Sequence, residues 1–184
     1  MTPACSFYLE RAAPTQGGAA TSKLAISVFG GVSISFDRQE LQLTNRKARA
    51  LLAYLALSET GREGRERLAG LLWPDTSEQN ARASLREVLM DLREALSACG
   101  CHALVPGRQD VELISHAVDV DLIRILDDIA AGRTPEMLLM QARVGETILS
   151  GYDDISPLFH DWVVATRVPC TGAAGSRVGA RLRK

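Results

Sequence analysis

The chain has 184 residues, of which 46% are hydrophobic and 23% are charged, and its 21 basic and 22 acidic side chains give a net charge of −1 at neutral pH. This composition describes a globular protein with one or two small domains, each able to bury a core. The balanced charge argues against a general binder of polyanions, so any nucleic-acid binding has to be confined to a local patch. Because the sequence has neither an apolar run of membrane-spanning length nor a secretory signal, we expect a cytoplasmic protein that does not bind membranes.

The amino-terminal part of the chain divides into a leader and a hairpin. Residues 1–22 are rich in Ala, Gly, Pro, Thr and Ser without periodicity, and we expect a disordered leader there. Residues 24–29 (LAISVF) and 32–36 (VSISF) are β-branched and aromatic runs separated by Gly30 and Gly31, which predicts two strands joined by a hairpin. A third short strand is expected at residues 41–43.

A first helix is expected to follow Thr44, as its cap, and to continue through residue 57. Its first turn carries the basic residues Arg46, Lys47 and Arg49, which oppose the helix dipole. This pattern indicates an external anion or a contact with another part of the protein, although solvated side chains are the simpler interpretation. A second helix is expected over residues 65–72, ended by Trp73-Pro74-Asp75 because proline disfavours helix in the residue before it.

The third helix, over residues 78–96 and capped by Ser77 or Thr76, carries the most information about function. At about 100° per residue, one third of its circumference is apolar. This apolar face comprises Ala81, Leu85, Val88, Leu89, Leu92 and Leu96. Arg82, Arg86 and Arg93 lie on the flank of that face, and Glu87, Asp91 and Glu94 lie on the remaining side. A helix that reads a DNA groove needs one buried face and an adjacent face of donors. The alternative is an ordinary surface helix with paired charges.

A hairpin follows the third helix, which is expected to end at Gly100. Residues 104–113 (LVPGRQDVEL) read as two brief strands around Pro106 and Gly107, with Arg108 near the tip. The order of elements is therefore strands, three helices and a wing-like hairpin.

This order resembles the OmpR/PhoB-type winged-helix DNA-binding domain. The segments RKARALLAYLAL (46–57), RERLAGLLWPD (65–75) and ARASLREVLMDLREAL (81–96) resemble the DNA-binding segment of the AfsR/EmbR-type activators, often called SARP regulators. The resemblance implies an α+β fold over residues 23–116, namely a winged helix-turn-helix with an N-terminal β-sheet. The chain departs from the family at Met90 and Asp91, where a basic or small polar pair is usual; Asp91 either faces away from DNA or weakens binding.

The next residues resemble the start of the helical bacterial transcriptional activator domain of that family. The matching segments are VDVDLIRILDDI (118–129), a helix over 135–149 that begins with proline, and LSGYDDISPLFHDWVVATR (149–167). We therefore expect a short all-α, TPR-like segment over 117–168, followed by a disordered basic tail over 169–184 in place of further helix pairs, as in a truncated product. Its apolar side chains can then bury only against one another or the winged helix. They are Leu122, Ile125, Leu126, Leu138, Leu149, Phe159 and Trp162.

The resemblance implies sequence-specific binding of duplex DNA for regulation of transcription, with the third helix (77–97) in the major groove and the hairpin (104–113) on the adjacent backbone. Arg82, Arg86 and Arg93 are expected to reach base edges or phosphates. Asn80 and Ser84 are candidates for contact with phosphate or with the start of the helix. Arg108 is a candidate for minor-groove or backbone contact, and Lys47 is a weaker phosphate candidate. RNA polymerase and a second copy on tandem repeats are the further partners that the resemblance suggests.

Other functions have less support in the sequence. No enzyme is expected, because a glycine-rich phosphate loop, a nucleophile elbow and an HExxH pair are all missing. Cys99-x-Cys101 followed by His102 is weak evidence for zinc, so neither a metal site nor a cofactor is expected. The serious alternative is a helical protein-interaction module over 118–162, or a non-functional truncated regulator with a vestigial winged helix. The salt dependence of binding distinguishes DNA binding from protein association. Binding of DNA through arginines weakens steeply as the salt concentration rises, whereas apolar association does not.

Overall fold

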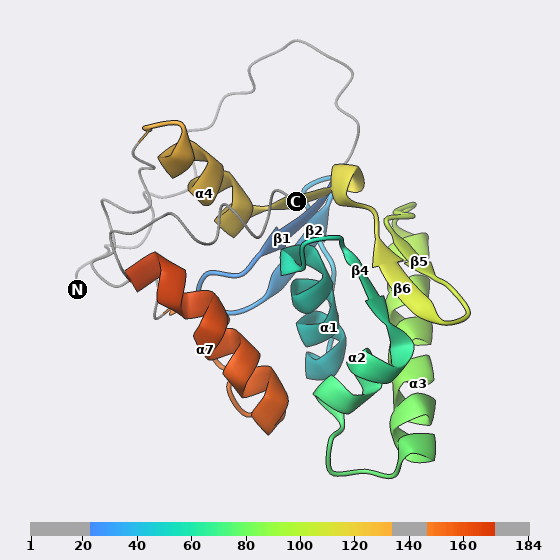
Figure 1. The fold of residues 1–184 in the computed structure, drawn as a ribbon. Coiled ribbons are helices and arrows are strands. Elements are labelled where there is room, and N and C mark those ends of the chain that lie inside the picture. Colours follow the sequence, from blue (N-terminus) through green and yellow to red (C-terminus); the bar gives the residue numbers. More distant parts are fainter. Residues whose placement is uncertain (1–22, 134–146, 172–184) are drawn as a thin grey trace, which may run out of the picture.

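The computed structural model describes residues 23–133 and 147–171. Its first unit is a four-stranded sheet with the strand order β3-β2-β1-β7 (Figure 1). Strands β1 (Leu24–Ser27) and β2 (Ser33–Phe36) form the predicted antiparallel hairpin, and both glycines of its loop take positive φ, 76° at Gly30 and 131° at Gly31. The apolar side chains of the two strands that point inward, such as Ile26 and Ile34, are buried.

The third strand lies two residues earlier than expected. Strand β3 is Gln39–Glu40 and not residues 41–43. The reason is the turn before it: Asp37 and Arg38 have φ of 50° and 66°, so a tight two-residue turn follows β2 at once and pairing begins at Gln39. The backbone N–H of Leu41 still donates to the carbonyl of Ile34 at 2.8 Å, after which the chain leaves the sheet.

The three helices expected over residues 44–96 are present as α1 (Arg46–Leu57), α2 (Arg65–Leu72) and α3 (Glu78–Ala98). The cap of α1 is Asn45 and not Thr44, because the Asn45 Oδ1 accepts the N–H groups of Lys47 and Ala48 at 3.0 and 3.3 Å. The Ser77 hydroxyl caps α3 by accepting the N–H of Asn80. All six residues predicted for the apolar face of α3 are buried.

The wing is a three-stranded sheet in the order β4-β6-β5, in which β5 (Leu104–Pro106) and β6 (Asp110–Leu113) are the predicted hairpin. The third strand, β4 (Arg62–Gly64), lies between α1 and α2, where no strand was predicted from the sequence. Its polar, glycine-containing sequence gives no strand signal, and the pairing depends on Gly61, whose φ is 66°. A Cβ at Gly61 would lie 2.5 Å from the carbonyl oxygen of Leu113, so only glycine allows this approach.

The chain then returns to the first sheet. After a short 3-10 turn, η1 (Ser115–Ala117), residues Val118–Val120 form strand β7, which pairs parallel to β1. Helix α4 (Asp121–Ala130) therefore begins three residues later than the helical segment expected from residue 118. Asp121 fixes this junction. Its buried carboxylate accepts the hydroxyl of Ser27, the N–H of Val28 at 3.1 Å and the N–H of Leu122 at 2.7 Å.

The carboxyl-terminal segment packs on the winged helix. Ile148 forms an isolated bridge with Phe29, and the Leu149 N–H donates to the Val28 carbonyl at 2.7 Å, so residues 148 and 149, expected at the end of a helix, are not helical. Helix α7 (Pro157–Thr171) continues past the expected start of the tail at residue 169. The leader 1–22, most of the helix expected over 135–149, and residues 172–184 lie outside the described residues.

One hydrophobic core unites these parts. Phe159 and Val163 of α7 are fully buried in the cluster that also holds the winged-helix residues. The Trp162 ring lies 4.9 Å from Tyr54 of α1 and 5.0 Å from Phe159 between ring centroids. Among the apolar residues expected to bury in this way, Leu122, Ile125, Leu149 and Phe159 are buried and Leu126 and Trp162 are partly buried, whereas Leu138 lies outside the described residues. Within the described ranges, no helix is long and apolar enough to span a membrane.

Candidate nucleic-acid interface

Helix α3 and the wing lie together at one side of the molecule, and α4 and α7 lie at the other (Figure 1). Helix α3 packs through its apolar face on α1 and α2, which leaves its outer face open. The predicted helix-turn-helix is therefore present, and no described segment covers its longer helix from outside. This exposed face is the surface that a groove-reading helix needs.

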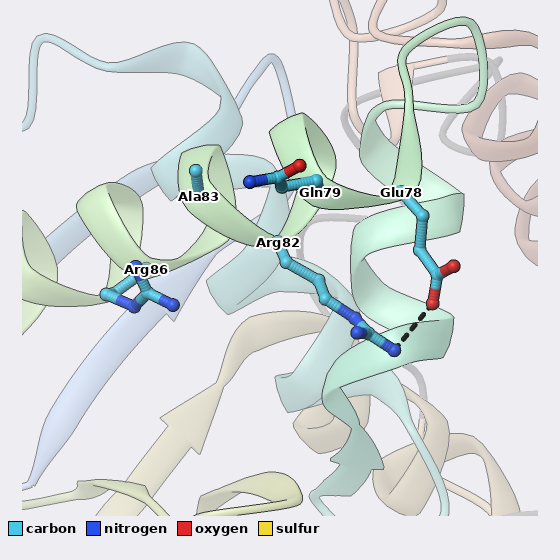
Figure 2. Close-up of a pocket in the computed structure, with 5 residues that line it drawn as sticks. All are labelled: Glu78, Gln79, Arg82, Ala83 and Arg86. Atoms are coloured by element: carbon cyan, nitrogen blue, oxygen red, sulfur yellow. Dashed lines mark ion pairs between the residues drawn. The ribbon is translucent and has the colours of Figure 1, made fainter.

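The outer face of α3 is a row of side chains spaced along its length. In projection at about 100° per residue, Arg82 and Arg93 lie within about 40° of Arg86. The positions that point most directly away from the buried face are Ala83, Met90 and Glu94, and Gln79 lies between them and the arginines. The Met90 side chain is 63% exposed. Figure 2 shows Gln79, Arg82, Ala83 and Arg86 projecting from two successive turns of α3. The predicted arginines are thus brought together with residues that the sequence interpretation did not select.

Asn80, Ser84 and Asp91 lie on a different flank. The same projection places each of them about 120° to 160° from Arg86, on the side of α3 that also carries Glu87. Asn80 and Asp91 are exposed and Ser84 is half-buried. Asp91 therefore points away from the arginine row, and Asn80 and Ser84 do not line the groove beside the wing.

A groove separates α3 from the wing and the start of α2. The residues lining it are Gly64, Arg65, Glu66, Arg82, Leu85, Arg86, Arg108 and Gln109. The Arg65 N–H donates to the Gln109 carbonyl at 2.9 Å, which ties the wing to the first turn of α2. The Arg65 Nε is buried and has no hydrogen-bond partner among the described residues. Four arginines from three elements, namely Arg65, Arg82, Arg86 and Arg108, converge on this groove.

These cations differ in their partners. Arg82 is held by two carboxylates, because its Nη2 lies 2.7 Å from Glu66 Oε1 and 2.5 Å from Glu78 Oε1. Figure 2 shows the Arg82 side chain turned toward Glu78, while Arg86 lies one turn further along α3. In the described part of the chain, Arg86, Arg93 and Arg108 are exposed and form neither an ion pair nor a side-chain hydrogen bond. Their guanidinium groups are therefore available to an external anion.

Lys47 is engaged inside the protein. Its Nζ donates to the carbonyl of Leu72 at 2.6 Å, at the end of α2, and lies 4.7 Å from the centroid of the Trp73 ring. Partial burial lowers the pKa of Lys47, against a smaller opposing effect of the nearby Asp75. Lys47 thus connects the end of α2 to α1, and only its remaining N–H groups are available to a phosphate.

The other basic residues at the start of α1 contact the carboxyl-terminal segment. Arg46 forms an ion pair with Asp154, with Nη1 to Oδ2 at 3.1 Å, and donates to the carbonyl of Gly151. Arg46 and Arg49 both lie over the Tyr152 ring, at 5.7 and 5.9 Å from its centroid. Of the interpretations left open by the sequence, contact with another part of the protein is therefore the observed one.

Several residues of this surface were not selected from the sequence, namely Gln79, Ala83 and Met90 of α3 and Gly64, Arg65, Glu66 and Gln109 beside the groove. Gln79, Ala83 and Met90 recur at helical spacing on one side of α3, and a full projection of that helix would have found them. Arg65 and Gln109 carry no such signal, because they join the surface only when the wing folds onto α2.

Neither a family model nor the sequence of a curated protein matches the chain. A solved structure does match it. This structure is Mycobacterium tuberculosis EmbR in complex with a low-affinity phosphopeptide, with 21% sequence identity and a TM-score of 0.55. The chain is similar in fold to EmbR. The match covers 82% of this chain and 44% of EmbR, so the chain spans less than half the length of that protein. The α+β fold with an N-terminal sheet and a winged helix, expected from the sequence, is thereby confirmed.

Proposed function

We propose that this protein binds duplex DNA at specific sequences to regulate transcription, with α3 in the major groove and the β5–β6 hairpin on the adjacent backbone. The observation that carries the proposal is the exposed arginine row of α3 across a groove from Arg108. An α-helix fits the major groove of B-DNA, where an arginine can donate to guanine O6 and N7 together. The near-neutral net charge is consistent with this arrangement, because Arg86 and Arg108, which are exposed and unpaired among the described residues, lie together at one groove.

The exposed residues divide into base and backbone contacts. Arg86, near the middle of the row and free of partners, is assigned to a base edge. Arg93 and Arg108 lie on either side and are assigned to phosphates. Beside the arginine row, Gln79 has the amide that pairs with adenine, whereas Ala83 and Met90 offer apolar contact to the methyl group of thymine.

The remaining predicted residues have secondary roles in this proposal. Asn80 and Ser84, on the flank away from the wing, are assigned to the phosphates of the strand on that side. Lys47 contributes at most through the donors that Leu72 leaves unused. The similarity in fold to EmbR supports a regulator of this type, while RNA polymerase and a second copy on tandem repeats stay predictions from the family resemblance, as does a cytoplasmic location.

The test is a titration of duplexes selected by the purified protein from a random pool, followed by fluorescence anisotropy. Arg86→Ala is expected to lower affinity for the selected duplex by about tenfold or more, the range of one bidentate base contact. Arg124→Ala is the matched control, because it removes the same charge from an exposed position of α4 on the other side of the molecule. Equal losses in the two variants would contradict the proposal.

The alternative of a helical protein-interaction module has less support. It requires an apolar surface on residues 118–162, yet Leu122 and Phe159 are buried in the common core and Ile125 is buried as well. The large apolar side chains of this region that are exposed among the described residues, Ile129 on α4 and Leu158 on α7, lie on separate helices. Association that is insensitive to salt and to Arg86→Ala would favour this alternative.

A further inference from the structure

We propose that Glu66 and Glu78 determine specificity by holding Arg82 in a triad that opposes contact with the DNA backbone alone. This inference rests on the proposed DNA binding. Arg82 is the one arginine of the α3 row with intramolecular partners among the described residues, and its partners come from two helices, Glu66 of α2 and Glu78 of α3. The triad has one positive and two negative charges, so it repels phosphate although it exposes an arginine.

The positions of the two carboxylates strengthen this inference. Glu66 lies in the first turn of α2 and Glu78 in the first turn of α3. The amino-terminal turn of a helix is where unpaired N–H groups and the helix dipole attract an anion, and DNA phosphates are bound in this way. Glu66, which lines the groove, and Glu78 therefore place fixed negative charges at the starts of α2 and α3, where a phosphate would otherwise gain most.

The hydrogen-bond geometry explains how a correct site overcomes this repulsion. Both ion pairs use the Nη2 atom of Arg82. A bidentate contact of arginine with two neighbouring acceptors uses Nη2 together with Nη1 or Nε. Because two glutamates occupy Nη2, Arg82 has to release one of them before it can donate two hydrogen bonds to a base edge. All three side chains are exposed, at 49% for Arg82, 80% for Glu66 and 75% for Glu78, and exposed ion pairs are weak enough to exchange. At a DNA site that offers base contacts, these contacts compensate for the free energy lost when the Arg82–glutamate ion pair breaks. A site that offers only phosphates does not compensate for this loss.

The experiment compares the wild type with Glu66→Gln and Glu78→Gln on a selected duplex and on an unrelated duplex of equal length, by anisotropy at low and moderate salt. Each substitution is expected to raise affinity for the unrelated duplex by about three- to tenfold at low salt, with a smaller gain on the selected duplex. The ratio of specific to nonspecific affinity therefore falls. Because both side chains are exposed, circular dichroism should show an unchanged fold.

Two controls separate the triad from a general effect of charge. Glu87→Gln removes the same charge from an exposed residue of α3 that forms no ion pair within the described ranges, and it should give a clearly smaller gain. In an Arg82→Ala background, the gain from Glu66→Gln should be clearly smaller than in the wild type, because the part that comes from releasing the arginine is gone.

An equal gain for all three glutamine variants, or a gain from Glu66→Gln of undiminished size without Arg82, would overturn the triad while leaving DNA binding intact. A wild-type protein that binds neither duplex would instead overturn the proposed function, and the triad with it.

Discussion

Replacement of Phe159 tests whether α7 and the winged helix form one cooperative unit. The Phe159 side chain is fully buried, contacts Trp162 at 5.0 Å between ring centroids, and belongs to the core cluster that contains the α1 and α2 residues. Removal of a buried phenylalanine side chain costs about 3 to 5 kcal/mol in transferred area and residual cavity. With a urea dependence of about 2 kcal/mol per molar, Phe159→Ala should lower the unfolding midpoint by about 1.5 to 2.5 M.

The two tryptophans of the chain make the assay specific to each part. Trp73 lies at the end of α2 and Trp162 lies on α7. In a Trp162→Phe background, fluorescence reports the winged helix, and in a Trp73→Phe background it reports α7. Phe159→Ala should lower the midpoint by the same amount in both backgrounds, because the core is continuous. Phe159→Leu is a milder variant that should cost about 1 to 2 kcal/mol if the alanine variant fails to fold.

A shift confined to the Trp162 signal would refute this reasoning. The helix would then be a separate unit docked on an independently stable winged helix, and its burial of Phe159 would contribute nothing to the stability of the DNA-binding surface.

Three further predictions concern the wing, a half-buried ion pair and the outer face of α3. Arg108→Ala should weaken binding to selected and unrelated duplexes alike and reduce the slope of log affinity against log salt by about one in anisotropy titrations, whereas a loss restricted to the selected duplex would indicate a base contact. Hydrogen bonds from Arg167 lower the pKa of Asp153, so the stabilisation is present above the ordinary carboxyl pKa of about 4 and is lost as the pH falls through the lowered value. The difference in urea midpoint between the wild type and Asp153→Asn should therefore be largest near neutral pH and shrink in acid; a constant difference would contradict this origin. Replacing thymine by deoxyuridine in the selected duplex should weaken wild-type binding by about threefold at one position and leave Met90→Ala unaffected, and equal sensitivity in both proteins would exclude Met90 as the contact.

The sequence was informative where the structure depends on local spacing. The buried face of α3 follows from a 3.6-residue repeat, and the end of α2 follows from Trp73-Pro74, so both were predicted closely. The Arg82–Glu78 pair has the i,i+4 spacing that a helix brings together, and could also have been found.

Other features depend on contacts between distant residues. Strand β7 exists because Val118 and Val120 pair with Leu24 and Ile26, and such apolar residues are equally compatible with the helix that was expected. Strand β4 depends on the close approach of Gly61 to Leu113. Glu66 reaches Arg82 only after α2 and α3 pack, so the local sequence cannot show that this arginine is already occupied.

The central claim is that Arg86 reads a base in the major groove. Its most direct test is to replace each guanine of the selected duplex by 7-deazaguanine, which lacks the N7 acceptor but keeps Watson–Crick pairing. For the wild type, we predict a loss of about tenfold at one guanine, and for Arg86→Ala we predict no further loss at that position. Equal losses in both proteins, or full wild-type affinity at every substituted guanine, would contradict the claim.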